Sequence, residues 1–359
     1  MTFVENTLLA LVRSGINNSS DSIGKLSSKE WSNVIDLAEK QGVLAIAFDG
    51  VQHLSKNCQP DIDNLMEWLG QTSYMETQYE EHKRVIEHLS HFYEEQGIKM
   101  MILKGYGVSL DYPHPNHRPV GDIDVYLYGL WQFADQMMHD RMGIFVDESQ
   151  YHHSTFQFEG MSVENHFDFL NIHSHKSNNA IEQRLKELTK EKGKEILPNV
   201  FLPCPNLSAL FVIRHAACDF AAGNMTLRQM LDCILVMYKH KNEIDWDAFW
   251  QDVMFMGMQD FALTIVSLAN KILEYSMDSF HIPTDCHVNE KLTKDSLTDI
   301  FHSKYAGERP KGYLKYVPWM LGRWWSNRWK HKMVYSDSLL STFVYQTISH
   351  FKKPELMKG

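Results

Sequence analysis

The sequence predicts an α+β protein in which a small mixed sheet is flanked by helical regions at both ends. Apolar residues recur at helical spacing before residue 95 and after residue 200, and short alternating segments lie between these two parts. A length of 359 residues is enough for two or three domains, and 44% hydrophobic with 22% charged residues is typical of a folded globular chain.

We expect four regions along the chain. They are residues 1–95, a helical region; 96–200, the α+β core; 201–300, a helical domain; and 301–359, a basic segment rich in aromatic residues. In the first region, Ser27 and Glu30 have the spacing of a capping box, and the helix that they begin continues to Lys40. Helices at 42–54 and 61–96 follow, the second of which could break near Gly70. We expect no chemistry from this region.

The core begins with an apolar run at 100–103, which ends in a turn at Lys104 and Gly105. A short helix at 106–111 and a Pro/His loop lead to a second apolar strand that carries Asp122 and Asp124. Side chains two residues apart in a strand point to the same face, so these two carboxylates are expected side by side.

Two neighbouring carboxylates repel each other unless a cation lies between them. Carboxylate oxygens are the ligands that Mg²⁺ prefers, and substrate phosphates often complete its shell. Asp122 and Asp124 are therefore candidate magnesium ligands. The competing interpretation is a solvated strand end with two surface acids.

The turn at Lys104 and Gly105 suits an anion, because a strand, a glycine turn and the start of a helix present free backbone N–H groups. Arg118 stands just before the second strand and can pair with a phosphate or with a carboxylate.

These residues together resemble a known family. Leu103-Lys104-Gly105, Tyr-Pro-x-Pro at 112–115, Arg118 and Gly-Asp-Ile-Asp at 121–124 are similar to the uncharacterised nucleotidyltransferase family of the polymerase-beta-like superfamily. The resemblance implies a polymerase-beta-like nucleotidyltransferase core. The chain has Lys-Gly-Tyr where the superfamily has Gly-Ser or Gly-Gly, so the way in which the triphosphate is held stays open.

The resemblance also implies a third carboxylate from a later strand. Its V-E-x-H pattern falls on Val163, Glu164 and His166, which makes Glu164 the first candidate and Asp168 the second. His166 shares the face of Glu164 and is expected to orient a carboxylate or to contact the nucleotide. The competing interpretation is an ordinary amphipathic hairpin strand with a polar outer face.

Further elements follow in order: a helix at 131–141, an edge strand at 143–146, a hairpin of 155–158 with 161–170, a charged helix at 178–194, a proline-rich linker at 198–205 and apolar helices over 207–240. Arg228 and Asp232 are four residues apart on one helix and can pair. One interpretation is a buried ion pair that locks two helices together. The other, which the resemblance implies, is that the two residues contact the substrate.

Histidines are dense at positions 152, 153, 166, 173 and 175. A zinc site is one interpretation, since imidazole is a common zinc ligand, but no Cys or H-E-x-x-H pattern accompanies them. Polar or capping histidines are therefore preferred over a zinc site.

The net charge of −10 argues against a templated nucleic-acid polymerase. Five scattered cysteines suit a reducing compartment, and neither a signal peptide nor a transmembrane segment is expected, which favours the cytoplasm. In 301–359, tryptophans alternate with Lys and Arg, a pattern that fits either a surface-binding helix or aromatics packed on the body.

We therefore expect an enzyme that moves an NMP from an NTP to a hydroxyl or similar acceptor on a small molecule or protein, using Mg²⁺ or Mn²⁺ and releasing pyrophosphate. The expected catalytic and metal-binding residues are Asp122, Asp124 and Glu164, and the expected nucleotide-binding residues are Lys104, Gly105, Arg118, His166 and Arg228. The alternatives are a catalytically inactive nucleotide- or partner-binding protein of the same fold, and a zinc hydrolase.

Overall fold

The structure is a computed structural model that describes residues 1–21, 23–223, 225–304, 310 and 312–352. Its α-helices before residue 200 are α1 (Phe3–Asn17), α2 (Ser28–Lys40), α3 (Leu44–Gln52), α4 (Ile62–Glu94), α5 (Tyr106–Ser109), α6 (Trp131–Met142) and α7 (Asn178–Leu188), with a 3₁₀ turn η1 (Pro115–His117). Those after residue 200 are α8 (Pro205–Ala222), α9 (Leu227–Lys239), α10 (Trp246–Phe255), α11 (Gln259–Leu273), α12 (Glu290–His302), α13 (Tyr313–Ser326), α14 (Arg328–Val334) and α15 (Leu339–Lys352), with η2 (Met277–Phe280).

The strands form one mixed sheet across the described ranges. They are β1 (Met100–Ile102), β2 (Ile123–Tyr126), β3 (His153–Phe158), β4 (Met161–His166), β5 (Lys194–Leu197) and β6 (Val200–Leu202), in the order β3-β4-β2-β1-β6-β5. The central strand β2 is antiparallel to β1 and parallel to β4, and its Asp124 is paired in register with Glu164. The predicted mixed sheet is thus confirmed, and its register brings the two acids together.

The sheet is larger than the sequence predicts. Residues 198–205, predicted to be a linker, include β6, which pairs in parallel with β1 at Met100 and Val200. The charged helix predicted to reach residue 194 ends at Leu188, and β5 follows. Residues 143–146, predicted to be an edge strand, form no strand, and the isolated bridge between Asp147 and Thr155 lies just after them. Strands of three or four residues are too short for periodicity to identify them.

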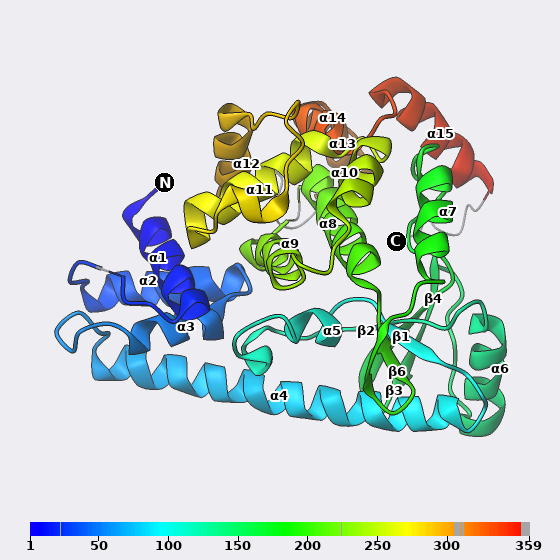
Figure 1. The fold of residues 1–359 in the computed structure, drawn as a ribbon, viewed down its shortest axis with the longest axis horizontal. Helices are drawn as coiled ribbons and strands as arrows, with labels where there is room; N and C mark the ends of the chain where they lie inside the picture. The colour runs from blue at the N-terminus through cyan, green and yellow to red at the C-terminus, as the bar shows by residue number, and fades with distance from the viewer. Residues whose placement is uncertain (22, 224, 305–309, 311, 353–359) are drawn as a thin grey trace.

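Helix α4 connects the N-terminal helices to the sheet. Figure 1 shows it running along one side of the molecule, from the α1–α3 group to the strands. Gly70 does not break it, and the capping box of Ser27 and Glu30 is present at the start of α2. The second half of α4, through Val85 and Leu89, packs in one core cluster with the sheet, whereas α1–α3 share a second cluster with α8–α12.

The C-terminal segment packs in part on the helical domain. Trp329 of α14 meets Phe220 of α8 edge-on with ring centroids 5.4 Å apart, and the buried Lys330 pairs with Asp299 at 2.6 Å. Trp325 of α13 is 60% exposed. Residues 305–309, 311 and 353–359 of this segment lie outside the described residues. Among the described helices, none has both the length and the hydrophobicity needed to cross a membrane.

Candidate active site

A cavity of about 190 Å³ lies between the start of β2 and the helices α8 and α9. Residues from both sides line it: Lys104, Gly105, Arg118, Asp122 and Asp124 from the core, and His215, Arg228 and Asp232 from the helices. The core and the helical domain therefore form the cavity together, and each side contributes both acidic and basic residues.

The two aspartates of the Gly-Asp-Ile-Asp motif both line this cavity, but they differ in exposure. Asp122 directly precedes β2 and is exposed, whereas Asp124 lies within the strand and is only 5% exposed. The Nζ of Lys104 lies 2.7 Å from Oδ1 of Asp124. Burial alone would raise the pKa of Asp124, but Lys104 and His166 outweigh it and hold that pKa far below its usual value.

Glu164 is the third acid at this place. It lies on β4 opposite Asp124 of β2, and in parallel strands such register partners point to the same face. Ligand atoms of Asp124, Glu164 and His166 lie within 4.8 Å of one another. Asp168, the second candidate, lies beyond the end of β4 and pairs with Lys186 instead.

His166 connects these acids. Its Nε2 is 3.0 Å from Asp124 Oδ1 and 3.3 Å from Glu164 Oε2, and the ring is almost fully buried. Burial lowers the pKa of His166, but the hydrogen bonds to Asp124 and Glu164 outweigh it, so the pKa is raised. A protonated His166 and Lys104 would together neutralise the negative charges of Asp124 and Glu164.

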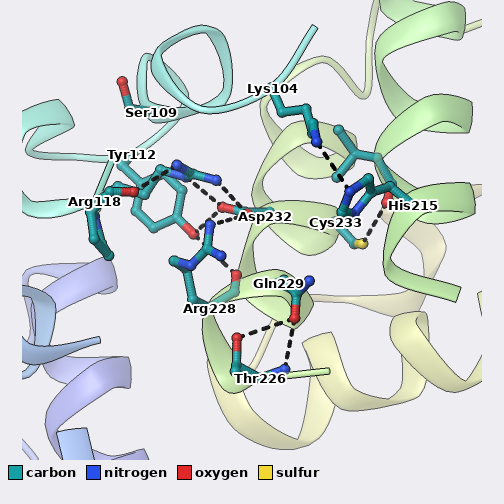
Figure 2. Close-up of polar contacts among 12 residues, drawn as sticks. Lys104, Ser109, Tyr112, Arg118, His215, Thr226, Arg228, Gln229, Asp232 and Cys233 are labelled. Carbon is teal, nitrogen blue, oxygen red and sulfur yellow. Dashed lines mark hydrogen bonds and ion pairs between the residues drawn. The ribbon is translucent and has the colours of Figure 1, made fainter. Parts of the chain in front are cut away.

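The turn after β1 approaches the acids closely. Gly105 has φ +58°, a conformation that favours glycine, and a Cβ there would lie 3.4 Å from the carbonyl oxygen of Asp122. The helix α5 that follows has four residues, shorter than the predicted 106–111, so any anion would meet the turn itself rather than a long helix. Lys104 also contacts Nε2 of His215 at 3.2 Å (Figure 2), a contact that spans 111 residues of sequence.

Arg118 pairs with a carboxylate, which is one of its two predicted partners. Its Nε and Nη2 bind the two oxygens of Asp232 at 2.9 and 2.8 Å, and Tyr112 donates its hydroxyl to the same carboxylate at 2.7 Å (Figure 2). The predicted pair of Arg228 with Asp232 is also present, at the longer distance of 3.5 Å. Arg228 lines the cavity and is more exposed than Arg118, so its guanidinium can also meet a ligand.

Three of the five clustered histidines lie together, and the other two each contact a different tyrosine. His152, His153 and His166 have ligand atoms within 4.8 Å of one another. His173 faces the ring of Tyr151, and His175 stacks on Tyr335 with centroids 3.5 Å apart. The sequence shows the density of histidines, but only the pairing of β3 with β4 determines which of them meet.

The fit of a divalent cation can be judged from the donor atoms. Asp124 and Glu164 offer oxygens from adjacent strands, and Asp122 adds an exposed carboxylate at the same cavity. Mg²⁺ and Mn²⁺ prefer oxygen ligands with open positions for phosphate, so the residues fit such an ion.

Acids on adjacent strands, one of them at a cavity that also carries basic residues, fit the binding of a phosphate ester through a divalent cation. A family model described as "Uncharacterised nucleotidyltransferase" matches residues 27–274, and the chain belongs to this family. The resemblance seen in the sequence is thereby confirmed, and the match includes the whole of the cavity. No curated protein and no solved structure matched the chain.

Proposed function

We propose that the protein transfers an NMP from an NTP to a hydroxyl or similar acceptor on a small molecule or protein, and releases pyrophosphate. The observation that supports this most is the register of β2 with β4. It places Glu164 beside Asp124, and Asp124 lines a cavity together with Asp122 and Arg228. Membership of the nucleotidyltransferase family supports the general reaction.

Asp122, Asp124 and Glu164 would hold Mg²⁺ or Mn²⁺ at this cavity. Such ions neutralise phosphate charge and stabilise the entering and leaving oxygens of an in-line displacement. Phosphoryl and nucleotidyl transfer depend chiefly on positioning and electrostatics, which this group of residues can supply.

In this proposal the side chains act in sequence. Glu164, whose side chain is 19% exposed, accepts the proton of the attacking hydroxyl. The hydroxyl oxygen forms its bond to the α-phosphorus as the bond from that phosphorus to the bridging oxygen breaks. Lys104 leaves its contact with Asp124 and binds a phosphate oxygen. Arg228 and the backbone N–H groups near Gly105 hold the triphosphate.

Nucleotide or partner binding without transfer is the second candidate function. Oδ1 of Asp124 already contacts both Lys104 and His166, so the buried acid has cationic partners without a metal. A binding protein would keep this arrangement.

A transfer assay separates the two functions. The protein is incubated with each α-labelled NTP, Mg²⁺ or Mn²⁺, and a panel of hydroxyl acceptors that includes the protein itself. We expect label on an acceptor and free pyrophosphate, with the rate at least ~100-fold lower in Asp124→Asn, which removes one charge from the site. Asp36→Asn on the exposed face of α2 is the matched control and should not change the rate. Nucleotide binding without transfer supports the second function. If the protein neither binds nor transfers a nucleotide, both proposed functions are contradicted.

A further inference from the structure

Three imidazoles gather at the open end of the β3–β4 hairpin. His153 is the first residue of β3 and His166 is the last residue of β4, and the two are paired directly across the strands. Side chains of directly opposite residues in an antiparallel pair lie on the same face with their Cβ atoms about 5 Å apart. The register of the hairpin therefore brings these two rings together.

His152 completes the group because its backbone is fixed to the end of β4. Its carbonyl oxygen accepts hydrogen bonds from the backbone N–H groups of Phe167 and Asp168, both at 3.1 Å. The ring centroid of His152 lies 4.4 Å from that of His153 and 5.5 Å from that of His166. One ring nitrogen from each histidine lies within 4.8 Å of the other two.

Two of these rings have an unsatisfied polar atom. Nδ1 of His152 and Nδ1 of His153 are buried without a hydrogen-bond partner among the residues that the structure describes. A buried polar atom without a partner costs about 1–3 kcal/mol, so such atoms usually indicate a missing ligand, ion or water. Two in adjacent residues, beside a third imidazole, point to one shared ligand.

A carboxylate lies next to two of the three rings. Glu164 is 3.6 Å from Nε2 of His153 and 3.3 Å from Nε2 of His166. On its other side, Nδ1 of His166 lies 3.3 Å from the carbonyl oxygen of Asp168, a contact of the type that orients metal-binding histidines. Three imidazole nitrogens make the protein donor set of a four-coordinate ion with a water in the fourth position, and Glu164 is left to the proposed magnesium site.

We propose that His152, His153 and His166 form a binding site for a transition-metal dication of the zinc type, in which a water takes the fourth position. Nitrogen donors select Zn²⁺, Co²⁺ or Ni²⁺ over Mg²⁺, which distinguishes this site from the oxygen ligands of Asp122 and Asp124. The proposal rests on the hairpin geometry and holds whether or not the protein transfers nucleotides.

The test uses Co²⁺ as a visible probe. Full-length protein is freed of metal with a chelator, passed through a desalting column and titrated with Co²⁺ in the presence of excess Mg²⁺. We expect one equivalent to bind with the intense visible absorption of four-coordinate cobalt, and stoichiometric Zn²⁺ to displace it. His152→Ala and His153→Ala should each weaken binding at least ~10-fold, since each removes one ligand.

Two controls make the result specific. His139→Ala removes an exposed histidine of α6 and should leave Co²⁺ affinity unchanged. Asp122→Asn should also leave it unchanged, although the proposed nucleotide transfer would lose a metal ligand. Failure of the transfer assay therefore contradicts only the proposed function, and failure of the cobalt titration contradicts only the histidine metal site.

The proposal is overturned if wild-type protein binds no Co²⁺, or if His152→Ala and His153→Ala bind it as tightly as wild type. Circular dichroism reports whether each variant is folded. If a variant unfolds, X-ray absorption of the zinc-loaded wild type decides: at least three nitrogen donors at about 2.0–2.1 Å support the site, and an oxygen-only shell refutes it.

Discussion

Asp232 connects the core to the helical domain through a single carboxylate. It is buried on α9 and accepts hydrogen bonds from Nε and Nη2 of Arg118, which lies in the loop before β2. It also accepts a hydrogen bond from the hydroxyl of Tyr112. Arg118 is itself 3% exposed, so its charge depends on this partner. Burial raises the pKa of Asp232, but Arg118 outweighs it, and the pKa lies below its usual value.

Asp232→Asn should therefore be strongly destabilising. Removing one member of a buried ion pair leaves the other charge buried and uncompensated, which costs about 3–5 kcal/mol of unfolding free energy. Urea denaturation measures this loss, with Asp36→Asn on the surface of α2 expected within about 0.5 kcal/mol of wild type. A loss below about 1 kcal/mol would show that Arg118 does not depend on Asp232.

The local part of the site could be predicted from the sequence. Asp122, Asp124, Lys104 and Gly105 lie within one stretch whose alternation and turn residues indicate their positions. The contact of Arg118 with Asp232 spans 114 residues, and no local pattern indicates it. Contacts of this kind follow from packing of the two domains rather than from periodicity.

The helices α1 and α3 touch at two glycines. A Cβ on Gly50 would lie 2.1 Å from the carbonyl oxygen of Leu11, and one on Gly15 would lie 2.2 Å from that of Ile46. Backbone carbonyls cannot move away as a flexible side chain does, so each glycine is required for the close approach of the helices.

Substitution by alanine should have opposite effects on the free energy of unfolding at Gly50, which is in close contact with α1, and at Gly70, which is exposed on α4. Gly50→Ala should lower the free energy of unfolding by about 1–3 kcal/mol through overpacking. Gly70→Ala should raise it by about 0.5–1 kcal/mol, because this exposed position in α4 has no neighbour within 4 Å of the new Cβ. Thermal or urea unfolding of both variants tests the contrast; equal changes would contradict the close packing of α1 on α3.

The short turn η1 is held between α3 and α4 by one histidine. His117 contacts Asp49 through Nδ1 at 2.8 Å and Glu76 through Nε2 at 2.9 Å. Burial lowers the pKa of His117, but the hydrogen bonds to Asp49 and Glu76 outweigh it, and the pKa is raised above 6.5.

A raised pKa means that the folded state binds the His117 proton more tightly than the unfolded state. This stabilisation is fully present below the unfolded pKa of about 6.5 and is lost as pH rises through the higher folded value. Wild type should therefore lose stability relative to His117→Gln as the pH rises above about 6.5, measured by urea unfolding at each pH. A difference that is constant with pH would refute the assignment.

At the scale of the whole molecule, the cavity forms where the sheet meets α8 and α9. The second half of α4 packs against an apolar face of the sheet, and Figure 1 shows this helix running past the strands. The mixed α/β class could be predicted, because helical periodicity is strong over long segments. The strand order could not, since β1 pairs with β6 nearly 100 residues away, and β5 and β6 are too short to show alternation.

The central claim is that Asp122, Asp124 and Glu164 bind nucleotide through a divalent cation. Isothermal titration with an NTP analogue whose α,β-bridge resists cleavage, in Mg²⁺ or in EDTA, measures this directly for wild type, Asp122→Asn and Glu164→Gln. The claim predicts binding in Mg²⁺ that EDTA abolishes and that each variant weakens at least ~10-fold. Equal affinity in EDTA and in both variants, or no binding by wild type, would contradict it.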